Sequence, residues 1–345
     1  MSRFAIRLPS LGAIPLALMI NAGSAETASA HVKWFCAYNV AAQPLGLEDV
    51  LCPDFEILIG ISIAWLLFGS VVEWTFIGDV MLRAMNRATR LLEENTELII
   101  RGGCVFFFVA IWVVGGIILT PELKTNAAWI GAVQLAIAVG MMSRRTMPLS
   151  GLGIFVLFDY ALWNYGAFHL ADYPIFLGVA AYVALTGAQT KFFGARPIDV
   201  VRWTAGITLM WASVEKWAYP EWSYPLFIQH PNLTLGFTPE FYMRAAGAVE
   251  FALAFALMWT PLVRRIAAIL LSAAFISALF DFGKLDLIGH TLIVVVLIGI
   301  VADSGSETLL TRRPWLVPLA YAGALSLFLT TYYLAHMVLF GTSLT

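Results

Sequence analysis

Ten apolar stretches follow one another along this chain, and most approach the ~20 residues that a helix needs to cross a membrane. A soluble domain would carry about 25% charged residues, whereas this chain of 345 residues has 12% charged and 60% hydrophobic residues. The sequence therefore predicts an all-α, polytopic membrane protein with about ten transmembrane helices. The expected spans are residues 56–73, 102–119, 127–142, 148–168, 173–189, 203–219, 241–260, 266–282, 287–302 and 315–338.

Two parts of the chain share an ordered series of short motifs. A Thr-Pro-Glu motif at residues 120–122 and again at 238–240 is followed in each case by a Gly-Ala-Val run, a double arginine and a Leu-Phe-Asp sequence. Such ordered recurrence indicates an internal repeat. The matched residues are Thr120 and Thr238, Glu122 and Glu240, Gln134 and Glu250, Arg144 and Arg264, and Asp159 and Asp281.

Each repeat covers four spans, so the chain returns to the same side and the two copies are parallel, related by an axis along the membrane normal. One further helix is expected before the repeats and one after them. The predicted divisions are an external N-terminal segment at 31–55, a first transmembrane helix with a cytoplasmic amphipathic helix at 56–100, repeats at 101–189 and 202–303, and a last transmembrane helix with an external tail at 314–345.

Residues 1–30 have the organisation of a secretory signal peptide, with Arg3 and Arg7 before an apolar core and small residues after it. Cleavage after Ala25 and cleavage after Ala30 both fit, and an uncleaved anchor is a third reading. All three place residue 31 outside the cytoplasm.

With the N-terminus outside, most basic residues fall in cytoplasmic connections, as the positive-inside rule requires. We therefore expect a multi-pass protein of a bacterial inner membrane, with the mature N-terminus and the C-terminus on the periplasmic side and the lipid bilayer as its surroundings. The net charge of −2 gives no indication of a nucleic-acid partner. The predicted cytoplasmic residues are Arg83, Arg87, Arg90, Arg101, Arg144, Arg145, Lys191, Arg196, Arg202, Arg264, Arg265, Arg312 and Arg313.

Two local features leave alternatives open. Between the first two spans, Met81 and Met85 fall on one helical stripe and Arg83 and Arg87 on another, so this helix either lies on the membrane surface or docks a partner. In the external segment, residues 36 and 52 are cysteines, which either pair in an oxidising compartment or remain free thiols.

Polar residues gather in the predicted external half, which holds all five histidines. Thr120 and Thr238 are expected to cap helices, with the following proline and glutamate in the first turn. Glu250 is harder to place, because it would lie ~13 Å inside the hydrocarbon layer, where an ionised side chain costs at least ~2.5 kcal/mol. It must face the interior of the bundle, be protonated or have a cationic partner. The candidate cations are Lys216, Lys284 and Arg244.

The second repeat resembles the DoxX family. The resemblance rests on an arginine and a glycine in its first helix, a lysine near the external end of that helix, a glutamate after a glycine in the second helix, and a double arginine at the third. These residues are Arg202, Gly206, Lys216, Gly247, Glu250, Arg264 and Arg265. The first repeat departs from the pattern, with Gln134 in place of the glutamate and no matching lysine. The resemblance implies a membrane subunit or accessory of a redox system, and it leaves open whether the chain is an enzyme.

Three functions are compatible with these features. The first is a redox-associated subunit with a periplasmic-face site for a quinone or a small anionic substrate; its chemical groups would be Glu250, Lys216, His290 and Lys284, and its ligand-binding groups Glu215, Trp217, Arg244 and Asp281. The second is copper handling by a free amine and imidazole at His31, completed by His169, His230, His290 or His336. The third is a non-catalytic assembly or scaffold protein. A periplasmic or membrane redox partner is expected for the first.

Overall fold

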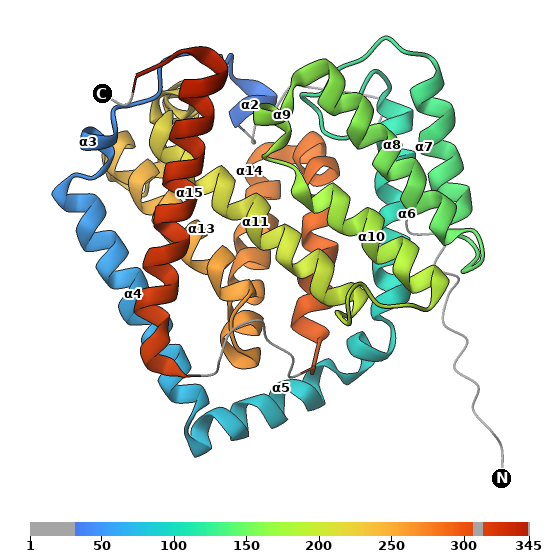
Figure 1. The fold of residues 1–345 in the computed structure, drawn as a ribbon, viewed down its shortest axis with the longest axis horizontal. Coiled ribbons are helices and arrows are strands. Elements are labelled where there is room, and N and C mark those ends of the chain that lie inside the picture. Colours follow the sequence, from blue (N-terminus) through green and yellow to red (C-terminus); the bar gives the residue numbers. More distant parts are fainter. Residues whose placement is uncertain (1–31, 306–312, 344–345) are drawn as a thin grey trace.

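The computed structural model of the protein describes residues 32–305 and 313–343, and the signal-peptide prediction for 1–30 lies outside that part. The described residues form helices and turns (Figure 1). Two isolated β-bridges occur among them, and none of these residues forms a β-strand. The prediction of an all-α chain is confirmed. The helices are α2 (Val32–Phe35), α3 (Leu47–Val50), α4 (Pro53–Glu73), α5 (Phe76–Glu94), α6 (Thr96–Val114), α7 (Trp129–Gly140), α8 (Met147–Tyr165), α9 (Ala167–Leu170), α10 (Pro174–Ala188), α11 (Pro197–Ala218), α12 (Tyr224–Gln229), α13 (Pro239–Leu257), α14 (Pro261–Ala302) and α15 (Val317–Phe340), with short 3-10 turns at η1 (Pro220–Ser223), η2 (Pro231–Thr234) and η3 (Pro314–Leu316).

Within the described part, five helical segments are long and apolar enough to cross a membrane. This confirms that the chain is a membrane protein. The segments are Pro53–Glu73, Thr96–Val114, Pro261–Ala278, Phe282–Ala302 and Pro314–Phe340. Two other apolar helices, α7 and α10, are shorter, at 12 and 15 residues. Several helices begin with proline at an early position, as in α4 and α11, where the missing backbone N–H leaves no helical bond unmade.

Helix α14 is a hairpin of two helical legs. As one straight helix its 42 residues would extend about 63 Å, yet Arg264 near its start lies 2.7 Å from Asp303 just past its end. The reversal occurs at Gly283, whose φ of 75° and ψ of −151° lie in a region open mainly to glycine. The two legs correspond to the predicted spans 266–282 and 287–302.

Helix α11 lies in the middle of the molecule and packs against α10 on one side and α13 on the other (Figure 1). The hairpin α14 packs against α13 and α6, while α4 and α15 lie beside α13. Large side chains fill these contacts, among them Trp217 and Trp259, which are almost fully buried. The helices thus form one continuous core around α11.

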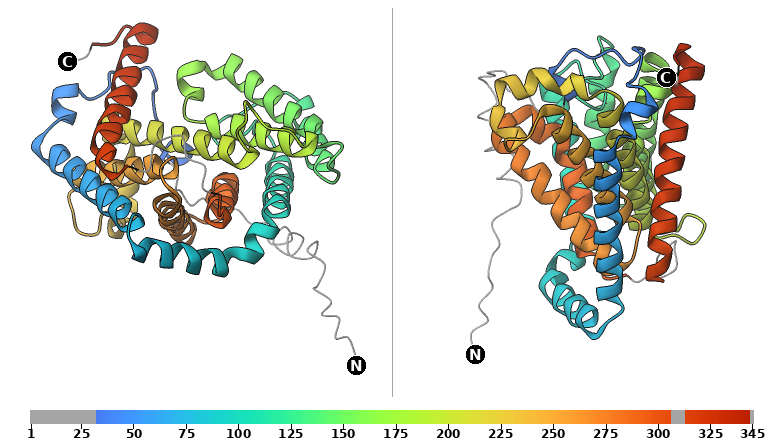
Figure 2. Two further views of the ribbon diagram at one scale, coloured as in Figure 1. Left: turned by 60° about the horizontal axis from the view of Figure 1, so that its bottom comes forward. Right: turned by 90° about the vertical axis from the view of Figure 1, so that its left-hand side faces the viewer.

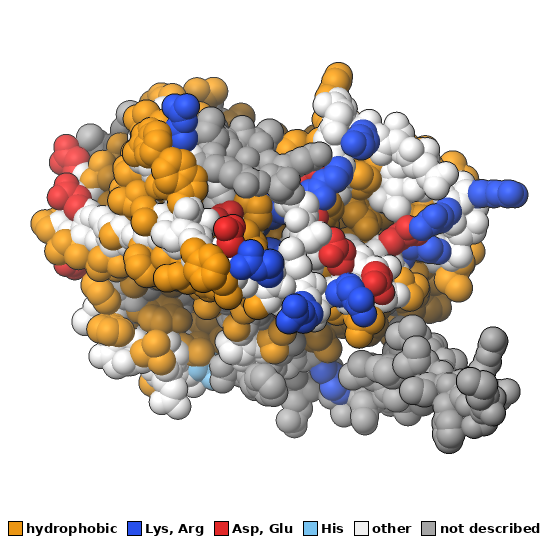
Figure 3. Space-filling model, turned by 90° about the horizontal axis from the view of Figure 1, so that it is seen from below, with side chains coloured by type: hydrophobic (Ala, Val, Ile, Leu, Met, Phe, Trp, Pro, Cys, Tyr) orange, Lys and Arg blue, Asp and Glu red, His pale blue; other side chains and the backbone are white. Residues whose placement is uncertain are grey.

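The amphipathic segment between the first two predicted spans is helix α5, which crosses the lower end of the bundle as drawn in Figures 1 and 2. Its apolar residues Phe76 and Ile77 are 75% and 60% exposed, and its arginines also face outward. Seen from below, Lys and Arg side chains gather over this end together with Asp and Glu (Figure 3). This exposure is what a helix lying on a membrane surface needs.

The two described ends of the chain meet at the upper end in Figure 1. The side chain of Gln43 donates to the carbonyl of Ser343 at 2.9 Å, and His336 lies 2.7 Å from the carbonyl of Val40. Of the two alternatives left open for Cys36 and Cys52, the structure shows the second, since both are free thiols. Cys36 follows α2 and lies near the backbone of Leu226, whereas Cys52 occupies the N-cap position of α4 without a side-chain hydrogen bond to the helix.

Candidate functional site

A cavity of about 620 Å³ opens in the upper half of the molecule between α11, α13, the hairpin α14 and the loop at η2. Its wall is mainly apolar and includes Leu209, Phe227, Phe237, Leu253, Leu271 and Phe275. Small residues on the facing helices, such as Ala212 and Ala246, leave the space open. Cavities of this size and character are typical of sites for small organic ligands.

Three of the predicted chemical residues lie together on the cavity wall. Lys216 Nζ is 2.9 Å from Glu250 Oε2, with both side chains partly exposed to the cavity, so the cation that Glu250 required is supplied by α11. His290 lines the wall from the second leg of α14. Lys284, beside the Gly283 reversal, is exposed and is not part of the wall.

A buried group of charges, here called the Lys33 cluster, borders the cavity, and two of its members, Asp172 and Glu215, are part of the wall. It consists of Lys33, Asp172 and Glu215, with Glu122 nearby. Lys33 contacts the carboxylates of both Asp172 and Glu215, the second at 2.5 Å, and its side chain is only 2% exposed. Asp172 Oδ1 has no hydrogen-bond donor among the described residues.

The electrostatics of the Lys33 cluster are dominated by burial. Burial alone lowers the pKa of Lys33, but the carboxylates of Asp172 and Glu215 outweigh it and hold that pKa above its usual value. Burial also raises the pKa of Asp172, against the attraction of Lys33. One ammonium therefore faces more than one buried carboxyl group, and the cluster favours holding a proton in addition to that of Lys33.

A second set of contacts extends the cluster. Glu122 Oε1 accepts a hydrogen bond from the hydroxyl of Tyr173 and lies 2.9 Å from His169 Nε2. All three side chains are buried, and Tyr38 covers the imidazole with ring centroids 5.7 Å apart. Tyr173 also lines the cavity, so these contacts connect the cavity wall with His169.

The predicted helix cap holds for one Thr-Pro-Glu motif and is wrong for the other. Thr238 caps α13 by accepting from the backbone N–H of Phe241 at 3.4 Å. In the first copy, residues 120–123 form a turn, closed by the Leu123 N–H bond to the Thr120 carbonyl, and α7 begins only at Trp129. The reason is that Glu122 turns inward to His169 and Tyr173 instead of remaining at a helix terminus.

His290 belongs to a buried pair in the hairpin α14. Its Nδ1 lies 3.0 Å from Asp286 Oδ1, and the side chain of Asp286 is fully buried. The imidazole packs between Trp34 and Phe275, with ring centroids 5.0 Å and 4.8 Å away. Trp34 is seated against Gly289, where a Cβ would come within 2.0 Å of its ring.

The predicted ligand-binding residues are divided among several places. Glu215 lines the cavity within the Lys33 cluster. Trp217 packs on Phe55 and Phe251, and its Nε1 donates to the carbonyl of Arg244 at 3.1 Å. Both Trp217 and Arg244 line a smaller hollow of about 190 Å³ instead. The side chain of Asp281 lies outside the described part of the structure.

The histidines proposed for copper do not come together in the described part of the chain. His169 contacts Glu122, His230 packs on Phe282, and His336 is fully buried between the hydroxyls of Tyr219 and Thr342. No group of three or more His, Cys, Asp or Glu side chains suited to a metal ion occurs among the residues described. His31 lies outside them.

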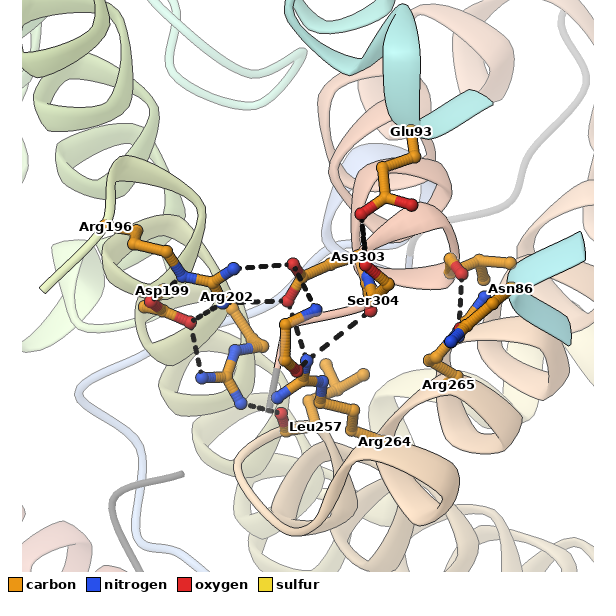
Figure 4. A network of polar contacts seen from close by, with 12 residues as sticks. Asn86, Glu93, Arg196, Asp199, Arg202, Leu257, Arg264, Arg265, Asp303 and Ser304 are labelled. Carbon is orange, nitrogen blue, oxygen red and sulfur yellow. Dashed lines mark hydrogen bonds and ion pairs between the residues drawn. The ribbon is translucent and has the colours of Figure 1, made fainter. Parts of the chain in front are cut away.

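A second buried charge cluster, here called the arginine cluster, lies at the lower end (Figure 4). Asp303 accepts from Arg196 at 2.8 Å and from Arg264 at 2.7 Å, while Asp199 accepts from both Arg196 and Arg202. Carbonyl and side-chain oxygens complete the arrangement, including Leu257 for Arg202, and Asn86 and Thr89 of α5 for Arg265. These side chains are not part of the cavity wall, and they connect α5, α11 and α14.

Sequence reasoning missed Lys33, Asp172 and Asp286 as site residues. The first two lie in short segments outside the predicted spans, which resemble solvated loops, and their contact joins positions 139 residues apart. Asp286 could have been noticed from its spacing, since a carboxylate four residues before a histidine on one helix faces it.

Comparison with known proteins gives no relative for this chain. No protein-family model matches it, and neither do any curated protein or solved structure. The site is therefore interpreted from its own geometry.

Proposed function

We propose that this chain is a redox-associated membrane subunit that binds a quinone-class lipid in the upper cavity. The observation that carries the proposal is a cavity of about 620 Å³ with an apolar wall and polar groups confined to a few positions. An isoprenoid quinone matches this distribution of apolar and polar groups, because its ring and tail are apolar and only its two ring oxygens form hydrogen bonds. The apolar cavity would take the ring, and the polar side chains would orient it.

Charge favours a quinone over a small anionic substrate. The carboxylates Asp172, Glu215 and Glu250 lie on the wall, whereas the cations Lys33 and Lys216 are already paired with them. An anion entering the cavity would have to compete with these carboxyl groups for Lys33 and Lys216. A neutral ring with hydrogen-bonding oxygens meets no such penalty.

The proposal includes the finer architecture expected from the sequence. We take the chain as DoxX-like, with about ten membrane-crossing helices in two parallel four-helix units and with the cavity on the periplasmic side of a bacterial inner membrane. The gathering of basic side chains at the opposite, lower end supports this orientation (Figure 3). Cysteine accessibility labelling in intact cells, at the exposed residues Arg87 and Glu221, tests it.

The ligand is tested with the full-length protein purified in detergent. Organic extraction followed by chromatography should recover quinone, and equilibrium dialysis should detect binding of added ubiquinone-1. Ala212→Phe places a ring in the cavity and should weaken that binding at least ~10-fold, or about 1.4 kcal/mol. Ala322→Phe, on the exposed face of α15, is the matched control and should bind normally. Wild-type protein that neither yields nor binds quinone would refute the proposal.

A further inference from the structure

The cavity is open on one side, between α13 and the first leg of α14. The two helices are joined at their lower ends by residues 258–260. Near this junction the wall residues Leu253 and Leu271 are buried, whereas Val249 and Ser277, farther up the same two helices, are exposed. The wall is therefore closed near the junction and open above it. We call this opening the mouth.

The rim of the mouth carries no charge. It is formed by Val249 of α13, Ala274 and Ser277 of α14, and Leu235 and Phe237 of the loop at η2. Val249, Leu235 and Phe237 are 56%, 78% and 54% exposed. Only Ser277 has a polar side chain, and its hydroxyl donates to the carbonyl of Ala274 at 2.8 Å. Charged side chains are common where a protein meets water, so this rim is suited to an apolar environment.

The mouth lies beside a surface that is suited to lipid. The first leg of α14, Pro261–Ala278, is one of the segments long and apolar enough to cross a membrane. Its large side chains Ile269, Leu270 and Ile276 are exposed and are not part of the cavity wall. Exposed apolar side chains on a spanning helix contact the hydrocarbon layer. Since Ser277 belongs to the same span, the mouth opens toward the bilayer.

We infer that the mouth is a lateral entrance from the bilayer, and that the tail of a long-chain quinone stays in it while the ring occupies the cavity. A long isoprenoid tail does not fit together with its ring into about 620 Å³, so it has to leave through an opening that accepts an apolar chain. The ligand is thus a membrane-resident quinone that is never released to water. This inference rests on the proposed quinone site and adds the route and the class of tail.

The test separates the tail from the ring. Full-length protein is reconstituted in phosphatidylcholine vesicles that contain ubiquinone-8, repurified in detergent and assayed for bound quinone. Ser277→Trp places an indole ring at the mouth and should lower the bound ubiquinone-8 at least ~10-fold relative to wild type. Its affinity for ubiquinone-1, measured by equilibrium dialysis, should stay within about 2-fold, because that short tail needs no space in the mouth. Retained binding of ubiquinone-1 also shows that the variant is folded.

Two further variants complete the test. Val249→Trp narrows the mouth from the other edge and should give the same result, whereas Ser326→Trp, on the exposed face of α15, should keep both ligands. The inference is overturned if both mouth variants retain ubiquinone-8, if they lose ubiquinone-1 to the same extent, or if the wild type binds only ubiquinone-1. The quinone site stands in each of these cases. Wild-type protein that binds neither quinone contradicts the proposed function itself.

Discussion

The two segments with matching sequence, residues 101–189 and 202–303, use the same residues in opposite ways. Arg144 of the first segment is exposed and paired with Glu97, whereas its counterpart Arg264 is fully buried in the arginine cluster. The glutamates show the reverse, since Glu122 is buried and Glu240 is exposed. At these matched positions, the first segment buries its glutamate at the upper end and the second buries its arginine at the lower end.

Gln134 and Glu250 extend this contrast. The amide of Gln134 is buried and donates to the carbonyls of Ile117 and Ile118 at 2.7 Å and 3.1 Å, which anchors the turn before α7. Glu250, at the matching position, lines the cavity and is paired with Lys216. The neutral Gln134 therefore holds a buried turn in place, whereas the charged Glu250 forms part of the cavity wall. The tertiary contacts around a residue, and not the motif that contains it, therefore decide which of two matched residues is available to a ligand.

The largest difference between the segments should appear at the arginines. Arg264→Ala leaves a buried space and removes a cation from Asp303, and we expect a loss of about 3–5 kcal/mol, the usual cost of breaking a buried pair. Arg144→Ala removes an exposed partner of Glu97 and should leave the melting temperature nearly unchanged. Thermal denaturation in detergent measures both. Equal effects would show that the two arginines are equivalent and would break the comparison.

The Lys33 cluster joins the segments, since Asp172 belongs to the first and Glu215 to the second. Lys33→Met keeps the length of the side chain but leaves the carboxyl groups without their cation. We expect a loss of about 1–3 kcal/mol near pH 7, the cost of an unsatisfied buried polar group. This is less than at Arg264, because methionine fills the space of the lysine side chain, whereas Arg264→Ala also leaves a buried space.

The effect of Lys33→Met should depend on pH in a defined direction. Burial raises the pKa of Asp172 in the folded protein, and loss of Lys33 removes the group that opposes that rise. A carboxyl group whose pKa is higher in the folded state stabilises folding at low pH and loses that contribution as pH rises through the folded pKa. The deficit of the variant should therefore shrink toward pH 4, about the ordinary pKa of aspartate. A deficit that grows on acidification would contradict this account.

A smaller difference is expected between the two matched glutamates. Glu122→Gln keeps the shape but weakens the contacts with His169 and Tyr173, and it should cost about 1 kcal/mol. Glu240→Gln, at the exposed start of α13, should have little effect. Melting temperatures of the two variants, measured side by side, test this. A larger effect at Glu240 would mean that the helix start, and not the buried cluster, is where the motif matters.

Much of the fold could be predicted because a membrane imposes one length and one composition on a spanning helix. The apolar segments at α4 and α6, and the reversal between the two legs of α14, follow from hydropathy and from the polar break around Gly283. The amphipathic helix α5 follows from its periodicity in the same way. Each of these features depends on residues that are close together in the chain, so the local sequence is enough to predict it.

The candidate site was predictable only in part, because its contacts join distant segments. The cost of burying an ionised Glu250 predicted a cationic partner, and Lys216, which is its partner in the structure, was among the candidates. The short segments between the apolar stretches carry no local pattern that predicts the contact of Lys33 with Asp172 or that of Trp34 with His290. The helix cap predicted at Thr120 is wrong for the same reason. The contact between Glu122 and the distant His169 outweighs the local preference of a Thr-Pro-Glu motif for a helix start.

The smallest expected changes in stability are at the two threonines of the matched motifs, Thr120 and Thr238, and the two changes should differ in sign. Thr238→Val removes the hydroxyl that caps α13, which should cost about 0.5 kcal/mol because the bond is long and exposed. Thr120→Val removes a buried hydroxyl that has no hydrogen-bond partner among the described residues, so the same change should be neutral or slightly stabilising. Chemical denaturation of both variants with the wild type measures the two signs. If both variants lose stability equally, Thr120 also acts as a cap in the folded protein, and the two segments are more alike than their structures indicate.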